Sequence, residues 1–137
     1  MILIDSSGLI ALLDRGERAH RAAKKVVEGD VGPLLVTDFV LAEVDYLILK
    51  RLGSKAQHAF VSQLLEGALT REPVTDADME RAIEIGRQFR EHEMGLTDST
   101  LMAVAERLDI RRILTLDRRH FTLFRDKKGR VFELLPS

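Results

Sequence analysis

Four acidic residues, spread over most of the chain, stand where the predicted secondary structure would bring carboxylates together. They are Asp5, Glu43, Asp98 and Asp117. Four carboxylates in one pocket repel one another, so protons or cations must compensate their charge. The chain has no cysteine, and oxygen ligands alone favour a hard cation such as Mg²⁺ or Mn²⁺. Such a cation neutralises phosphate charge and activates water, so phosphodiester hydrolysis is the chemistry that these acids fit best.

Two of the four acids follow short apolar segments that read as buried strands. Asp5 comes directly after residues 1–4, and Asp117 comes directly after residues 112–116. In a parallel sheet, ligands collect outside the carboxyl ends of the strands, where the strand order reverses. We therefore expect Asp5 and Asp117 to lie at one edge of a sheet.

The other two acids lie near the amino ends of predicted helices, which share that edge of a parallel sheet. Asp98 begins a helix predicted over 98–108. Glu43 lies in a helix predicted over 38–52, only about 7 Å from its start at a rise of ~1.5 Å per residue. Both lie on apolar stripes of their helices, although Asp45 competes with Glu43 for the inward position.

Each acid also has a simpler structural interpretation. Asp98 can cap a helix and favour its dipole, and Asp117 can begin a turn. Other acids near helix ends are interpreted only as caps, namely Asp14, Asp38, Asp76 and Asp78. The joint placement of four acids is what favours a functional site.

The elements that must position these acids alternate along the chain. Strands are predicted over 1–4, 34–36, 69–74, 112–116 and 131–135, and helices over 6–13, 19–28, 38–52, 54–68, 76–93 and 98–108. Capping boxes are expected at Ser54–Gln57 and at Thr75–Asp78, and Thr97 is expected to cap the last helix. This alternation predicts an α/β fold, a three-layer α/β/α sandwich around a short parallel sheet of four to five strands. A chain of 137 residues fits a single domain, 1–137.

Charge is distributed unevenly along the chain. The net charge is −1, but residues 107–130 hold nine Lys and Arg against three Asp, which leaves −7 on the rest. A local basic surface can hold a polyanion on an acidic protein, and the alternative is a solvated surface. Arg118 and Arg119 next to Asp117, together with Arg112, are the residues predicted to contact such a polyanion.

Four segments resemble, in order, the motifs of the PIN-domain family. Ile4–Ile10 is similar to the opening motif and Leu41–Val44 to the second. Thr97–Ala105 resembles the third motif, and Leu114–Phe121 resembles the fourth. The length of the chain points within this family to the VapC-type toxins.

This resemblance implies a three-layer fold, one or two Mg²⁺ or Mn²⁺ ions and endoribonuclease activity on tRNA or ribosomal RNA. It implies Asp5, Glu43, Asp98 and Asp117 as catalytic acids, the three aspartates as metal ligands, and Ser6 and Thr115 as supporting hydroxyls. It favours Glu43 over Asp45. One position departs from the pattern, because His120 stands where many relatives have a further acid.

The resemblance also implies partners. These are an RNA substrate, a VapB-type antitoxin and a second copy of the chain. Apolar residues on several sides of the predicted helix 38–52 independently favour a homodimer through this helix, namely Leu41, Tyr46, Ile48 and Leu49. The sequence has neither a signal-peptide pattern nor a membrane-spanning run, so we expect a cytoplasmic protein without a membrane partner.

Several alternative functions remain open at this stage. One is a PIN nuclease of RNA processing that is not a toxin, and another is a degenerate PIN domain that only binds RNA. A Mg²⁺-dependent phosphatase of the haloacid-dehalogenase type is disfavoured because Ser7 stands where its second Asp is needed. A receiver-like module is disfavoured because no acidic pair accompanies the first strand.

Overall fold

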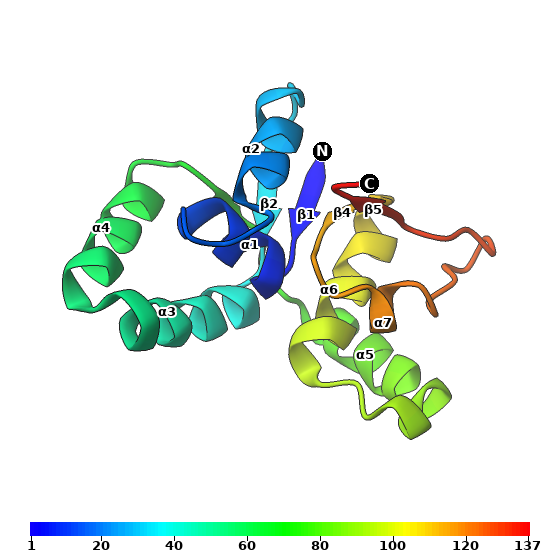
Figure 1. Cartoon of the computed structure of the whole chain (residues 1–137). Helices are drawn as coiled ribbons and strands as arrows, with labels where there is room; N and C mark the ends of the chain where they lie inside the picture. The colour runs from blue at the N-terminus through cyan, green and yellow to red at the C-terminus, as the bar shows by residue number, and fades with distance from the viewer.

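The computed structural model describes residues 1–137 as an α/β fold around one five-stranded sheet (Figure 1). All neighbouring strands are parallel, in the order β3-β2-β1-β4-β5. The strands are β1 (Ile2–Ile4), β2 (Leu34–Val36), β3 (Thr70–Arg71), β4 (Arg112–Leu114) and β5 (Glu133–Leu135). The predicted fold class is thus confirmed.

Helices connect each strand to the next. They are α1 (Ser6–Leu13), α2 (His20–Glu28), α3 (Asp38–Leu52), α4 (Ser54–Leu65), α5 (Asp76–Gln88), the 3₁₀ turn η1 (Arg90–His92), α6 (Leu96–Leu108) and α7 (Arg118–Phe121). None of them is both long and apolar enough to cross a membrane.

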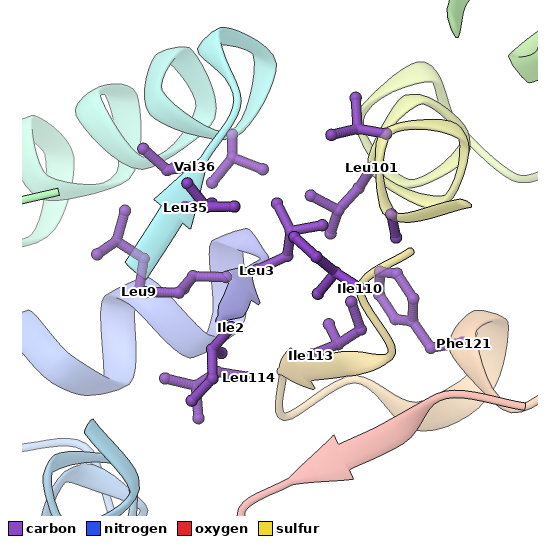
Figure 2. Packing of buried hydrophobic residues seen from close by; sticks show 14 of the residues in the cluster. Ile2, Leu3, Leu9, Leu35, Val36, Leu101, Ile110, Ile113, Leu114 and Phe121 are labelled. Atoms are coloured by element: carbon purple, nitrogen blue, oxygen red, sulfur yellow. The ribbon is translucent and has the colours of Figure 1, made fainter. Parts of the chain in front are cut away.

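The strand order reverses between β1 and β4. The chain first proceeds outward from β1 to β2 and β3, and then returns through α5 and α6 to β4 on the other side of β1. Because parallel crossovers are right-handed, this reversal changes the face that the helices cover. Figure 2 shows α1 with Leu9 on one side of β1 and α6 with Leu101 on the other. The carboxyl ends of β1 and β4 consequently meet at a topological switch point.

The hydrophobic core is continuous across both faces of the sheet. Ile2, Leu3 and Ile4 are fully buried, and so are Ile113 and Leu114 on the neighbouring strand (Figure 2). Strands buried on both faces read as uninterrupted apolar runs, which is why three-residue strands were recognisable in the sequence.

Several predicted boundaries differ from the structure. β3 has two residues instead of six, and both are exposed at the sheet edge, where Pro73 soon follows. The predicted helix 76–93 ends at Gln88 and continues as η1. The predicted helix 54–68 ends earlier, at Leu65, and α7 was not predicted at all.

Two of the predicted caps are wrong and one is right. α4 has no side-chain cap, because Gly53 with φ 90° turns the chain before Ser54, and Gln57 instead donates to Asp45 at 2.7 Å. α6 begins two residues earlier than expected, at Leu96, and its N-cap is Gly95 rather than Thr97. The capping box Thr75–Asp78 is confirmed in both directions.

Candidate active site

The four predicted acids line one pocket of about 210 Å³ at the carboxyl edge of the sheet. Asp5 follows β1, Asp117 follows β4, Asp98 lies in the first turn of α6, and Glu43 lies in the second turn of α3. The remaining lining residues are Ser6, Ser7, Gly95 and Thr97. No apolar side chain contributes to the lining. The juxtaposition follows from βα topology, since strand ends and helix starts share this edge.

Asp5 is the most buried of the four acids, with only 3% of its surface exposed. Its Oδ1 accepts hydrogen bonds from the backbone N–H of Gly8 and from the Ser7 hydroxyl, each at 2.8 Å. Its Oδ2 accepts from the Thr115 hydroxyl at 2.5 Å. Three donors therefore hold this carboxylate in place while it caps α1.

Burial raises the pKa of Asp5 to about 6. Its three hydrogen bonds oppose this change and the nearby charge of Asp98 adds to it. A carboxyl group whose charged form is penalised in this way gains from a nearby cation, which restores the ionised form.

Asp98 has a partner that was not predicted. The Nδ1 of His120 lies 2.8 Å from Asp98 Oδ2, and its Nε2 lies 3.2 Å from the backbone carbonyl of His92. The imidazole thus ties the start of α6 to α7 and η1. It is 18% exposed and does not line the pocket, so His120 orients Asp98 from behind.

Asp117 is held by an arginine of the same turn. The backbone N–H of Arg119 donates to Asp117 Oδ1 at 3.1 Å, and its guanidinium contacts both carboxylate oxygens at 3.2 Å. These contacts keep the pKa of Asp117 below its usual value. The Arg119 side chain is 83% exposed, so solvent and salt weaken this pair.

The structure separates Glu43 from its competitor. Glu43 is exposed and lines the pocket with the three aspartates, whereas Asp45 accepts a hydrogen bond from Gln57 of α4. Asp45 therefore has a structural partner, whereas the side chain of Glu43 forms no hydrogen bond or ion pair within the chain.

Hydroxyl groups surround the carboxylates. The Thr115 hydroxyl bridges Asp5 and the backbone of Asp117: it donates to Asp5 and accepts a hydrogen bond from the N–H of Asp117 at 3.0 Å. Ser7, which was not among the predicted site residues, accepts a hydrogen bond from the backbone N–H of Leu116 and donates one to Asp5. The Ser6 hydroxyl is buried and has no hydrogen-bond partner.

These residues suit a hard divalent cation. The pocket offers carboxylate and hydroxyl oxygens only, and the unpartnered Ser6 hydroxyl adds a polar atom that needs a partner. No three acidic or histidine side chains are close enough to hold one ion directly. An ion here would keep some of its waters, as Mg²⁺ usually does.

The arginines predicted to contact RNA lie in two different parts of the molecule. Arg118 and Arg119 begin α7 beside the pocket, and Arg118 donates to the carbonyl of Pro136. Arg112 lies at the other end of β4, where it pairs with Asp30 at 2.6 Å. Because Arg112 lies at the amino end of β4, its side chain is not near the carboxylates at the carboxyl end of the strands.

The pKa of Asp5 predicts a pH-dependent stability of the metal-free protein. Because the folded state holds this proton more tightly than the unfolded state, the free energy of unfolding should fall between pH 4 and 7, by about 3 kcal/mol from this group. In Asp5→Asn, the side-chain oxygen can still accept hydrogen bonds from Gly8 and Ser7, and the side-chain N–H can donate one to the Thr115 hydroxyl. Denaturant unfolding in EDTA should therefore give a stability difference between the variant and wild type that grows with pH. A difference that stays constant from pH 4 to 7 would contradict the assigned cause.

Comparisons with known proteins agree with the geometry. The family model of the PIN domain matches residues 2–127. Ribonuclease VapC26 of Mycobacterium tuberculosis is 34% identical over 135 residues, which cover 98% of this chain and 100% of the relative.

Solved structures give the same picture. VapC20 of Mycobacterium tuberculosis, described as a sarcin–ricin loop cleaving toxin, superimposes with a TM-score of 0.80 at 27% identity, covering 88% of this chain and 92% of that one. VapBC2 of Rickettsia felis, solved with a promoter DNA fragment, has a TM-score of 0.71 at 12% identity and covers 98% of both chains. The second match concerns the fold alone.

Proposed function

Because the chain belongs to the PIN-domain family, and within it to the VapC ribonucleases, we propose that it is a divalent-metal-dependent endoribonuclease and the toxin of a VapBC-type pair. The observation that carries this proposal is the shared pocket of Asp5, Glu43, Asp98 and Asp117. In this proposal one domain, residues 1–137, holds the whole activity.

Asp5, Asp98 and Asp117 would hold Mg²⁺ or Mn²⁺, directly or through water. When bound, the ion supplies charge neutralisation for the phosphate and lowers the pKa of water. Thr115 and Ser7 keep Asp5 oriented toward the pocket, and His120 does the same for Asp98. Glu43, which is exposed at the rim, is placed to accept a proton from the attacking water.

The substrate that we propose is structured RNA, either ribosomal RNA or tRNA. Ribosomal RNA is the first candidate, since VapC20 is described as cleaving the sarcin–ricin loop. Cleavage of either RNA would inhibit translation in the cytoplasm. A phosphatase or receiver function is not supported by any comparison.

The proposed partners are a VapB-type antitoxin and a second copy of the chain. An antitoxin arginine would be attracted to the acidic pocket and would compete there with the metal. The homodimer remains a prediction. Of the four residues that suggested it, Ile48 is buried within the chain and Leu41 is partly buried, whereas Tyr46 and Leu49 are exposed. Leu52 is a further exposed apolar side chain of α3.

We expect the purified protein to cleave ribosomal RNA in the presence of Mg²⁺ or Mn²⁺, because a divalent cation offsets the charge of the four carboxylates beside a phosphate. Cleavage should cease when EDTA is added. Restoring Mn²⁺ in excess should restore cleavage. Cleavage that continues unchanged in EDTA would contradict the proposed function.

A further inference from the structure

A second pocket adjoins the carboxylate pocket and has a different chemical character. It has a volume of about 240 Å³ and shares Ser6, Ser7 and Glu43 with the first pocket. Its other lining residues are Ile10, Glu17, Leu47, Arg51 and Leu116. Because three lining residues are shared, the two pockets are direct neighbours.

One face of α3 connects the two pockets. Glu43, Leu47 and Arg51 are spaced at i, i+4 and i+8, so they follow one another along the same face of the helix. Glu43 and Arg51 are therefore about 12 Å apart along the axis. This face presents, in order, a carboxylate at the catalytic end, an apolar side chain in the middle and a guanidinium at the far end.

Arg51 is a cation without a protein partner. No hydrogen bond or ion pair is formed by its side chain, and it is exposed. By contrast, Arg107, Arg112 and Arg130 of the basic segment are each paired with carboxylates. A guanidinium that is free, planar and beside a pocket is well suited to bind a phosphate through two N–H groups.

The rest of the pocket fits the other parts of a nucleotide. Ile10, Leu47 and Leu116 offer an apolar surface for a base. Glu17 can accept a hydrogen bond from a base N–H, and Ser6, whose buried hydroxyl has no hydrogen-bond partner, lines both pockets. The pocket therefore combines groups that can bind a base with a cation for phosphate.

We propose that this pocket is a nucleotide subsite for single-stranded RNA next to the scissile phosphate, with Arg51 binding the neighbouring phosphate. The subsite rests on the proposed ribonuclease function and adds to it the direction in which the RNA leaves the carboxylates, across α3 rather than along the basic segment 107–130. Substrate would then be held by residues from α1, α3 and the turn after β4.

The test compares Arg51→Met with Lys50→Met. Both variants remove one exposed positive charge from the last turn of α3, but Lys50 does not line the pocket and lies near the ring of Tyr46. Binding is measured by fluorescence anisotropy with a labelled single-stranded oligoribonucleotide of mixed sequence, in the presence of Mn²⁺. The Asp98→Asn background slows cleavage so that the RNA stays largely intact during the measurement.

Arg51→Met should weaken binding about tenfold, since hydrogen bonds to charged groups contribute more than neutral ones. It should also reduce the slope of log K against log salt concentration by about 0.7, as expected for one lost phosphate contact on a single strand. In the cleavage assay, the same substitution should raise KM with little change in kcat. Lys50→Met should change neither the slope nor KM.

Equal RNA affinities, salt slopes and KM values for the two variants would overturn the proposed subsite. An Arg51→Met variant that binds RNA normally but loses affinity for a protein partner would also overturn it. The proposed function fails differently, through a wild-type protein that does not cleave RNA with Mg²⁺ or Mn²⁺. If the protein cleaves RNA through its aspartates and Arg51→Met has no effect on binding or KM, only the proposed subsite is refuted.

Discussion

Asp98→Asn should lower the rate of RNA cleavage by about 10²–10³-fold or more, since a ligand that supports several kcal/mol of transition-state charge stabilisation is lost. Asn is nearly isosteric with Asp, and its side-chain oxygen can still accept from His120 Nδ1, which lies 2.8 Å from the carboxylate. The fold should therefore remain intact. The effect is measured as kcat/KM on ribosomal RNA at saturating Mn²⁺.

Asp76→Asn is the matched control for Asp98→Asn. Asp76 is also an acid in the first turn of a helix, but it is exposed on α5 and does not line the pocket. The control variant should cleave RNA at the wild-type rate. A similar loss in both variants, or full activity in Asp98→Asn with unchanged circular dichroism, would remove Asp98 from the site.

Gly8→Ala should reduce the free energy of unfolding by about 3 kcal/mol, because overpacking a closely packed core forces the backbone to move. A Cβ at position 8 would lie 2.2 Å from the carbonyl oxygen of Leu114. This contact is between α1 and β4, at the point where the two strands that carry Asp5 and Asp117 meet. The melting temperature should fall by about 10 °C.

Gly86→Ala should change the free energy of unfolding in the opposite direction from Gly8→Ala. Gly86 lies in α5, and a Cβ there has no neighbour within 4 Å. This substitution should raise stability by about 0.5–1 kcal/mol, since alanine is the better helix former. Chemical denaturation in EDTA measures both variants. A Gly8→Ala protein as stable as wild type would show that α1 is not packed against β4 as described.

The gathering of the four acids could be predicted because it depends only on the order of strands and helices. Asp5 and Asp117 follow strands, and Asp98 lies in the first turn of a helix. Each element had a clear local signal, and a parallel sheet brings these positions to one edge whatever the details of the packing.

The long-range partners of the acids could not be derived from local spacing, because they lie far from the acids in the sequence. Only the family resemblance implied Thr115 as a supporting hydroxyl. Thr115 donates to Asp5 across 110 positions. His120 reaches Asp98 across 22 positions, and only its place in the fourth motif drew attention to it. Nothing in the local sequence distinguishes such contacts from a solvated side chain.

Local rules failed where a tertiary demand was stronger. Ser54 has the form of a cap, but Gly53 adopts φ 90° to turn from α3 into α4 and leaves the cap unused. α7 is only four residues long, too short for a periodic signal, and depends on Asp117 accepting from the N–H of Arg119. The basic segment 107–130 was counted by charge alone, yet Arg107, Arg112 and Arg130 are used within the fold.

In the proposed function, the carboxylate pocket uses a divalent cation to hydrolyse RNA with water. The most direct measurement is a single-turnover cleavage in ¹⁸O-water with Mn²⁺, followed by mass spectrometry of the new RNA ends. Attack by water predicts a linear phosphate monoester that carries one ¹⁸O atom and does not form in EDTA or with Asp98→Asn. An unlabelled 2′,3′-cyclic phosphate formed equally well in EDTA would mean that the 2′-hydroxyl attacks without the cation, and it would contradict the role given to these four acids.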